Sequence, residues 1–198
     1  MGIVVNDSQN LFMLQTRSNS YAFGIDNQGL VRHLYWGSRI NAMEDFEMPE
    51  LAEVSTNDPV YEITKEEFPV YGGLRYKEHC LKVTFADGTR DVAYEYVNYE
   101  IQKNEQCEEL VIILKDKHYA LVMELHYKIY EAYDLMERFV VLKNESTEVM
   151  QIEKLHSGQF HVPYEGLNFR NVHGHWGAEQ QKFVQKVDYG KIIFENRR

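Results

Sequence analysis

Hydrophobic and polar residues alternate most regularly over residues 119–130, YALVMELHYKIY. Leu121, Met123 and Leu125 fall on one side of an extended chain, and Glu124 and His126 fall on the other. Successive side chains of a β-strand point to opposite faces of its sheet, so this period of two is typical of a strand with one buried face. The segment predicts a long strand that covers a hydrophobic core.

The rest of the chain also reads as strands, because runs of Val, Ile, Tyr and Phe are separated at short intervals by Gly, Asn and Asp. Asp26-Asn27-Gln28-Gly29 predicts a hairpin turn between YAFGI and LVRHLYW. Asp87-Gly88 predicts a second one, between LKVTF and the run that begins DVAYEY. The only helical candidate, residues 44–54, is interrupted by Pro49. These patterns indicate one all-β domain built of antiparallel hairpins.

Three further segments carry specific expectations. Residues 135–144, LMERFVVLKN, are apolar on both sides except at Glu137 and Arg138, which predicts a central strand covered on both faces. Residues 38–73 are acidic, contain three of the four prolines, and predict a long connection that either serves function or covers a sheet edge. The final YGKIIFENRR reads as a strand still in progress, so we expect the chain to be a fragment whose open strand edges favour self-association.

Composition narrows the functional classes. The formal charge of −10 and the lack of clustered Lys and Arg argue against a nucleic-acid partner. No stretch of about 18 apolar residues is present and the N-terminus lacks a signal-peptide pattern, so we expect a cytoplasmic protein without a membrane partner. Cys80 and Cys107 have no metal or redox spacing, which predicts two reduced thiols. No cofactor is indicated.

Catalytic motifs are correspondingly scarce. The 31 carboxylates are explained by solvated sheet faces, and spacing along strands does not define a catalytic pair. His173 and His175 would share one face of a strand, as two metal ligands do, but no third ligand is apparent. A metal enzyme built on this pair is therefore the least favoured of the three functional hypotheses that the sequence allows. Ser157 lacks a nucleophile motif, and Gly72-Gly73 lacks the helix and Lys of a phosphate loop.

Aromatic residues are better candidates for ligand binding. A flat apolar ring with a polar edge suits stacking on a sugar, although core packing is the more common role of such side chains. The aromatic residues considered for sugar stacking are Tyr35, Trp36, Tyr71, Tyr76, Tyr164 and Trp176.

Several local patterns, in order, resemble the N-terminal domain of family 36 glycoside hydrolases, the bacterial α-galactosidases. Residues 30–40, LVRHLYWGSRI, are similar to the family's L-x-H-x-Y-W-G stretch, and residues 67–72, EFPVYG, with Arg75 resemble its E-x-P-x-Y-G…R segment. Residues 87–91, DGTRD, follow at the expected distance. The pieces LHS at 155–157 leading to Pro163, GHW at 174–176 with Glu179, and the terminal NRR complete the resemblance, which spans residues 10–198.

The resemblance implies a twisted antiparallel β-supersandwich, similar to galactose mutarotase, that occupies residues 1–198 and ends before its last strands. In that family, two Asp residues of a following (β/α)₈ barrel carry out retaining hydrolysis of α-galactosides such as melibiose and raffinose. This chain contains no such barrel, so no catalytic residue is assigned in it, and no metal site. The alternative to such an enzyme domain is a free-standing carbohydrate-binding or mutarotase-like β-sandwich.

Family members are frequently homo-oligomers in which N-terminal loops approach a neighbouring active site. By this resemblance the loop 41–73 is the part that would contact substrate, with Glu50, Glu53 and Asp58 as its polar tips. Two departures weaken the correspondence. Gly73-Leu74-Arg75 stands where the family often has D-F-R, and Ala52 stands where an acidic residue is expected.

Overall fold

The computed structural model describes residues 2–43, 46, 48, 65–73, 77–162, 165–188, 190 and 192–193. The chain divides into two compact units, Met1–His161 and Val162–Arg198. The first contains the hydrophobic core, and the second contains one hairpin. The described residues are almost entirely strands and connections, with one short 3₁₀ helix, which confirms the all-β prediction.

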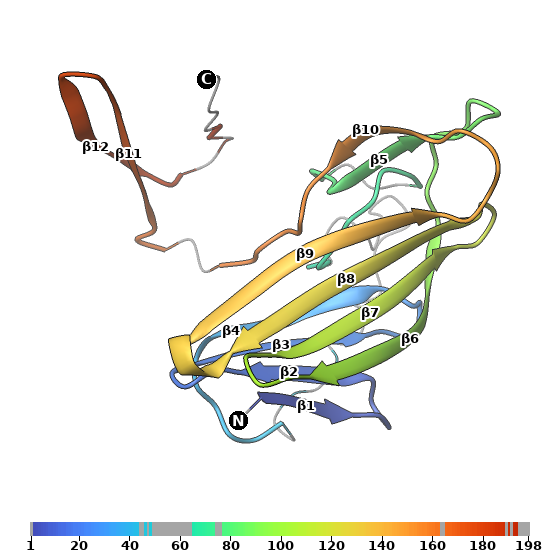
Figure 1. The fold of residues 1–198 in the computed structure, drawn as a ribbon, viewed down its shortest axis with the longest axis horizontal. Helices are drawn as coiled ribbons and strands as arrows, with labels where there is room; N and C mark the ends of the chain where they lie inside the picture. Colours follow the sequence, from blue (N-terminus) through green and yellow to red (C-terminus); the bar gives the residue numbers. More distant parts are fainter. Residues whose placement is uncertain are drawn as a thin grey trace. The chain divides into compact units, whose positions relative to one another are not determined.

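Two four-stranded antiparallel sheets form the body of the first unit (Figure 1). The first sheet has the order β1-β2-β3-β4, with β1 Gly2–Asn6, β2 Leu11–Gln15, β3 Asn19–Ile25 and β4 Val31–Ser38. The second has the order β6-β7-β8-β9, with β6 Tyr94–Lys103, β7 Glu108–Asp116, β8 Leu121–Tyr130 and β9 Leu135–Asn144. Every neighbouring pair follows directly in sequence, so both sheets are simple meanders.

Three smaller elements complete the described fold. A 3₁₀ turn, η1 Glu131–Tyr133, joins β8 to β9. The strands β5 Leu81–Thr84 and β10 Gln151–Leu155 form a separate two-stranded sheet. In the second unit, β11 Asn168–His175 pairs with β12 Ala178–Lys186.

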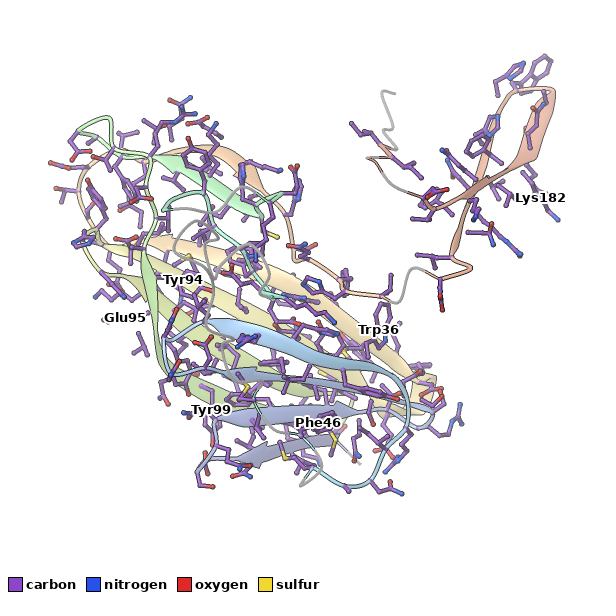
Figure 2. All side chains as sticks on the ribbon, turned by 180° about the vertical axis from the view of Figure 1, so that it is seen from behind. Trp36, Phe46, Tyr94, Glu95, Tyr99 and Lys182 are labelled. Carbon is purple, nitrogen blue, oxygen red and sulfur yellow. The ribbon has the colours of Figure 1, made fainter. Side chains whose placement is uncertain are left out.

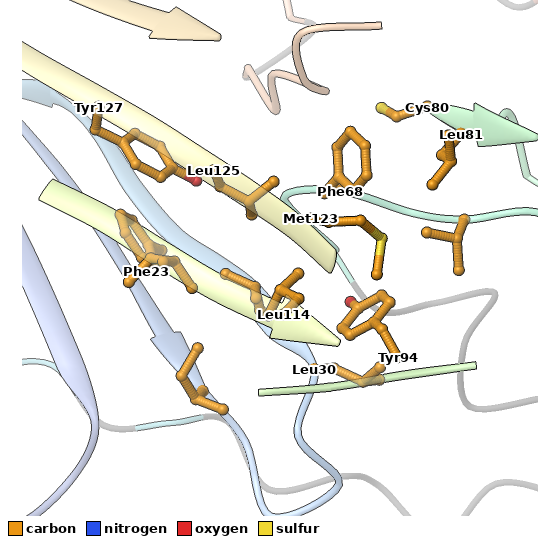
Figure 3. Close-up of a cluster of buried hydrophobic side chains, with 14 of the residues drawn as sticks. Phe23, Leu30, Phe68, Cys80, Leu81, Tyr94, Leu114, Met123, Leu125 and Tyr127 are labelled. Atoms are coloured by element: carbon orange, nitrogen blue, oxygen red, sulfur yellow. The ribbon is translucent and has the colours of Figure 1, made fainter. Parts of the chain in front are cut away.

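The core lies where the inner faces of the two large sheets meet (Figure 3). The inward residues of β8 are fully buried, as the alternation over 119–130 predicted. Aromatic contacts join the sheets, because Phe23 stacks on Tyr127 with ring centroids 4.7 Å apart and Phe12 meets Tyr99 edge to face at 5.2 Å. Burial of this apolar surface is the main favourable contribution to the fold.

A second, smaller hydrophobic cluster covers the outer face of the first sheet. Leu11, Met13 and Ala22 are buried there with Met43, and Tyr35 packs against Phe46 with ring centroids 5.9 Å apart (Figure 2). Consequently β2 is buried along its whole length. Strands covered on both faces therefore exist, but they are β2 and β3 and not residues 135–144.

The prediction of a central strand at 135–144 is wrong, because β9 is the last strand of its sheet among the described residues. Its outward residues are only half-buried or exposed. On that face Phe139 stacks on His126 of the same sheet, with ring centroids 4.5 Å apart.

Both predicted turns exist, but only one closes a hairpin. Gly29 adopts φ +80° in the turn that joins β3 to β4, and the Oδ1 of Asp26 accepts hydrogen bonds from the amides of Gln28 and Leu30. Around Asp87-Gly88 the chain also turns, with the amide of Gly88 bonded to the carbonyl of Phe85 at 2.9 Å. However, β5 pairs with β10 rather than β6, so the second hairpin prediction is wrong.

Candidate functional site

A pair of opposite charges lies inside the sandwich. Arg138 occupies an inward position of β9, directly opposite Tyr127 of β8. Glu67 belongs to a segment that runs beside β4, where its amide donates to the carbonyl of Val31 at 2.8 Å. Both side chains are removed from solvent, with 4% of the Arg138 side chain and none of Glu67 exposed. Burial of charge is costly unless it is paired and hydrogen-bonded, so this pair requires partners.

The carboxylate of Glu67 contacts four side chains. We call Glu67 and these four residues together the Glu67 cluster. The Nη1 of Arg138 lies 2.8 Å from Oε2, and the Nδ1 of His33 lies 2.8 Å from Oε1. The hydroxyl of Tyr21 is 2.7 Å from both carboxylate oxygens, and the hydroxyl of Tyr127 donates to Oε2 at 3.1 Å. In addition, Nη2 of Arg138 donates to the main-chain carbonyl of Glu67 at 2.6 Å.

These contacts fix the charge states of the cluster. Burial alone would raise the pKa of Glu67, but Arg138 and the hydrogen bonds from His33 and Tyr21 outweigh it and hold that pKa below its ordinary value of 4.5. Burial, together with the negative charge of Glu67, raises the pKa of the Tyr21 and Tyr127 hydroxyls. Burial disfavours the charge of Arg138, yet the surrounding Tyr127, Glu67 and Tyr21 raise its pKa. The result is an ionised pair held by two neutral phenols.

The Glu67 cluster is suited to holding the sandwich together and not to catalysis. Side chains of the cluster make two contacts with Oε1 and three with Oε2, so no position remains for a substrate proton. A recess of about 520 Å³ lies elsewhere, beside Arg17, Lys103 and Glu108, and no member of the cluster lines it. Glu67 is therefore a buried structural acid, in contrast to a general acid or base that must reach its substrate.

One surface segment depends directly on the Glu67 cluster. Residues 158–161 are attached to the main chain of residues 66–67, because the amide of Gln159 donates to the carbonyl of Glu67 at 3.2 Å and Nε2 of His161 lies 3.0 Å from the carbonyl of Glu66. Arg138 Nη1 also donates to the carbonyl of Gln159 at 3.1 Å. Burial lowers the pKa of His161, which favours the neutral imidazole at this position.

An exposed aromatic pair covers this attachment. Phe160 lies over the guanidinium of Arg138, with 5.5 Å from Cζ to the ring centroid, and its ring is 5.6 Å from that of Trp36. Both rings are partly open to solvent, and Figure 2 shows Trp36 at the surface of the sandwich. Of the aromatic residues considered for sugar stacking, Trp36, Tyr71 and Trp176 are exposed, whereas Tyr35 packs against Phe46. Tyr76 and Tyr164 lie outside the described residues.

The other predicted site residues are not brought together. Glu50, Glu53 and Asp58, and most of the loop 41–73, lie outside the described residues. His173 and His175 are exposed on β11, and an irregularity in the β11–β12 register separates them. Within the described ranges, no group of three or more His, Cys, Asp or Glu residues has the arrangement of a metal site. Cys80 is a buried free thiol whose pKa burial raises to about 11.

Sequence reasoning missed the Glu67 cluster, although two signals pointed to it. Arg138 interrupts an otherwise apolar strand at an inward position, and a buried cation requires a buried anion. Glu67 and His33 also stand in two of the segments that resemble the family patterns, 34 positions apart in the chain. The structure places these two side chains 2.8 Å from one another. The two sequence segments therefore meet at one ion-paired centre.

The fold and its buried centre define the class, an antiparallel β-sandwich domain whose sheets are joined by an ionic cluster. Residues 29–198 match the family profile described as the glycosyl hydrolase family 36 N-terminal domain. The chain therefore belongs to this family. None of the helices in the described residues has the length and apolar character that crossing a bilayer requires.

Relatives and solved structures agree with this assignment. The chain is 25% identical over 194 residues to probable alpha-galactosidase G of Aspergillus terreus, covering 90% of the chain and 26% of that protein. It is 21% identical to alpha-galactosidase AgaA of Geobacillus stearothermophilus, covering 100% of the chain and 30% of the relative. The crystal structure of AgaB from the same organism superposes with a TM-score of 0.86 at 22% identity, over 100% of this chain and 30% of that one. The chain thus spans less than a third of the length of these relatives.

Proposed function

We propose that the chain is the non-catalytic N-terminal domain of an α-galactosidase and that it has a structural and assembly role in that enzyme. The observation that supports this most directly is the Glu67 cluster. The fully buried carboxylate lies in one of the family-like segments, yet every one of its contacts is used to join the two sheets. The domain supplies a rigid body, and the catalytic residues belong to another part of the enzyme.

The proposed substrate class of the whole enzyme is the terminal α-galactoside, as in melibiose and raffinose. It is supported by the solved relatives, since AgaA variants of Geobacillus stearothermophilus have been crystallised in complex with raffinose and with stachyose. Glu50, Glu53 and Asp58 remain the proposed points at which this domain borders an active site, and that active site would be a neighbouring subunit's in a homo-oligomer. A cytoplasmic location also remains part of the proposal.

The proposal is tested by enzymology on the purified chain. Incubated with p-nitrophenyl α-galactoside, the chain is expected to release no p-nitrophenol above the buffer background. AgaB of Geobacillus stearothermophilus, assayed in parallel, provides the positive control. Turnover by the chain that persists after repurification and follows the protein peak would disprove the non-catalytic assignment.

A free-standing sugar-binding module is the second candidate, and the exposed pair of Trp36 and Phe160 is the observation in its favour. Aromatic rings at a surface stack on the apolar faces of sugars. Calorimetric titration of the chain with galactose, melibiose and raffinose distinguishes the two candidates. If the role is structural, no saturable heat of binding is expected for any of these sugars. Saturable sugar binding that a Trp36→Ala substitution abolishes would favour the sugar-binding module.

A further inference from the structure

The chain contains a single Asp-Gly pair, Asp87-Gly88, in the turn that follows β5. Glycine has no side chain to hinder its main-chain nitrogen. In a flexible peptide this nitrogen attacks the side-chain carboxyl of the preceding aspartate more readily than the nitrogen of any larger residue would. The contacts of this turn therefore decide whether Asp87 is chemically stable.

The reaction is an isomerisation with water as the only other reactant. The nitrogen of Gly88 bonds to Cγ of Asp87 and loses its proton, one Cγ–O bond breaks, and a molecule of water leaves a five-membered succinimide. Water then adds to either ring carbonyl. Opening at the main-chain carbonyl breaks its bond to the Gly88 nitrogen and gives isoaspartate with a free α-carboxylate, whereas opening at Cγ restores aspartate. The neutral carboxyl is the reactive form, because a carboxylate repels the nucleophile.

In the folded chain, all three reacting groups of the turn are already hydrogen-bonded. Oδ1 of Asp87 accepts from the amide of Thr89 at 2.9 Å, and Oδ2 accepts from the hydroxyl of Tyr119 at 2.8 Å. The amide of Gly88 donates to the carbonyl of Phe85 at 2.9 Å. The bonds from Thr89 and Tyr119 also hold the pKa of Asp87 below its ordinary value of 3.8, which favours the unreactive carboxylate.

The bond from Tyr119 differs in kind from the other two. An aspartate side chain commonly accepts from the amide two positions further on, so the Thr89 bond is local to the turn. Tyr119 lies 32 positions away, between β7 and β8. Its ring stacks on Phe85 with centroids 3.7 Å apart, and its own amide donates to Oδ1 of Asp116 at 2.9 Å. The tertiary structure therefore fixes the position of this hydroxyl.

We propose that Asp87-Gly88 is an isoaspartate-forming site, and that the hydroxyl of Tyr119 keeps it in the aspartate form by fixing the Asp87 carboxylate away from the Gly88 nitrogen. Reaction then requires the turn to open locally, as less stable segments of a folded protein do. The inference concerns this chain alone and does not depend on the enzymatic role of the parent protein.

Isomerisation would change the contacts made by the residues that follow the turn. An isoaspartate places one more atom in the main chain between Asp87 and Gly88, ahead of Arg90 and Asp91. Arg90 contacts both carboxylate oxygens of Glu153, from Nε at 2.9 Å and from Nη2 at 2.5 Å. Oδ1 of Asp91 accepts from the amide of Gly73 at 2.6 Å. The modified chain is therefore expected to hold β10 and the segment 71–73 less firmly.

The rate of isomerisation in the full chain tests the proposal. The chain is incubated at mildly acidic pH below its unfolding temperature. Isoaspartate is counted as methyl groups that a protein-isoaspartate methyltransferase transfers from labelled S-adenosylmethionine, and peptide mass spectrometry assigns it to a residue. The folded wild type is expected to react at least about tenfold more slowly than the same chain in urea, because the turn must first open.

Tyr119→Phe removes the hydroxyl and keeps the ring that stacks on Phe85. In the folded chain it is expected to accelerate isomerisation at Asp87 about tenfold, since one hydrogen bond to a carboxylate is lost. In urea the rates of the variant and the wild type should be equal. Urea denaturation checks that the variant is folded under the conditions of incubation.

Two matched variants separate the Tyr119 contact from other effects. The hydroxyl of Tyr130 donates to Glu137 at 2.8 Å, so Tyr130→Phe removes a bond of the same kind outside the turn. Val83 is fully buried in β5, so Val83→Ala lowers the stability of the fold without touching the turn contacts. Both variants are expected to keep the wild-type rate. Asp87→Glu should abolish the signal, because cyclisation would need a six-membered ring.

Three results would overturn the proposal. Isoaspartate that forms in urea at other residues but not at Asp87 excludes the site. An unchanged rate in folded Tyr119→Phe excludes the role of the hydroxyl. Acceleration by Val83→Ala equal to that by Tyr119→Phe would show that overall stability, and not this contact, protects the turn.

Discussion

Individual residues of the Glu67 cluster depend on one another because their side chains are buried. An ion pair in a low-dielectric interior offsets the cost of dehydrating both charges only while both partners are present. Removal of one partner leaves an uncompensated charge. The consequence of each substitution is therefore determined by what remains in the core.

Replacement of Arg138 by Met is expected to lower the free energy of unfolding by about 3 kcal/mol, since Glu67 is left buried without its counter-charge. The double variant Glu67→Gln/Arg138→Met costs less than the sum of the two single changes, because it buries no charge. Urea denaturation of the four proteins measures this coupling. Lys143→Met on the same strand is the control and is expected to change the free energy of unfolding little. If the effects of the two single changes simply add in the double variant, the pair is not ionised.

The hydroxyls of Tyr21 and Tyr127 stabilise the same carboxylate. Tyr21→Phe and Tyr127→Phe keep the rings and remove one donor each, so we expect losses of about 1–2 kcal/mol in the free energy of unfolding. Tyr133→Phe, at an exposed position, provides the matched control and is expected to match the wild type. Thermal unfolding measures the stability of all three variants. Equal stabilities of the buried and the exposed variants would contradict the role of the two buried hydroxyls.

The lowered pKa of Glu67 makes stability depend on pH in a defined direction. Above its unfolded value of 4.5 the carboxylate is ionised in both states, and its full contribution to stability is present. As the pH falls below this value the unfolded chain takes up the proton first, so the contribution is progressively lost. The unfolding free energy of the wild type should therefore decline more steeply below pH 4.5 than that of Glu67→Gln, whereas Glu148→Gln, at an exposed site, keeps the wild-type slope.

At the scale of elements, the segment 158–161 is held close to β9 by a small residue. A methyl group added to Gly158 would lie 2.5 Å from Cζ of Arg138, a guanidinium that its other contacts keep in place. Glycine is needed here for close approach. The chain leaving β10 can therefore pass directly over the Glu67 cluster and carry Phe160 to the surface.

Gly158→Ala is accordingly expected to lower the free energy of unfolding by about 1–3 kcal/mol through displacement of Arg138. In the Arg138→Met background the same change should cost less, because Cζ is no longer present. A double-mutant cycle followed by urea denaturation measures the difference. Equal costs in both backgrounds would show that the strain arises elsewhere.

At the scale of the whole molecule, the hydrophobic core and the terminal hairpin belong to different units. Both hydrophobic clusters and every member of the Glu67 cluster lie within residues 1–161, whereas the hairpin β11–β12 lies within 162–198. A unit with its own core folds independently of its neighbour. The first unit should therefore fold without the second.

A chain shortened to residues 1–161 is expected to unfold cooperatively, with a free energy within about 1 kcal/mol of the full chain. Urea denaturation of the shortened and the full chain measures the difference. Loss of the folded state in the shortened chain would contradict the independence of the sandwich.

The sequence by itself determined the all-β class, the long strand β8 with its buried face, and the turn before β4. Alternation along 119–130 and the turn at Asp26–Gly29 are local properties, since a period of two and a turn residue act within a few positions. The family-like segments also lie in the sequence in order, and the family assignment agrees with them. These features do not depend on which strands become neighbours.

Only the tertiary structure decided which strands pair and which residues meet. An apolar run such as 135–144 fits a central strand or an edge strand equally well, and the turn at Asp87-Gly88 does not dictate that β5 joins β10. Likewise Glu67, His33 and Arg138 come from three separate segments. Their contact exists because the packing of two sheets closes a water-free interior, in which a charge is stable only beside its partner.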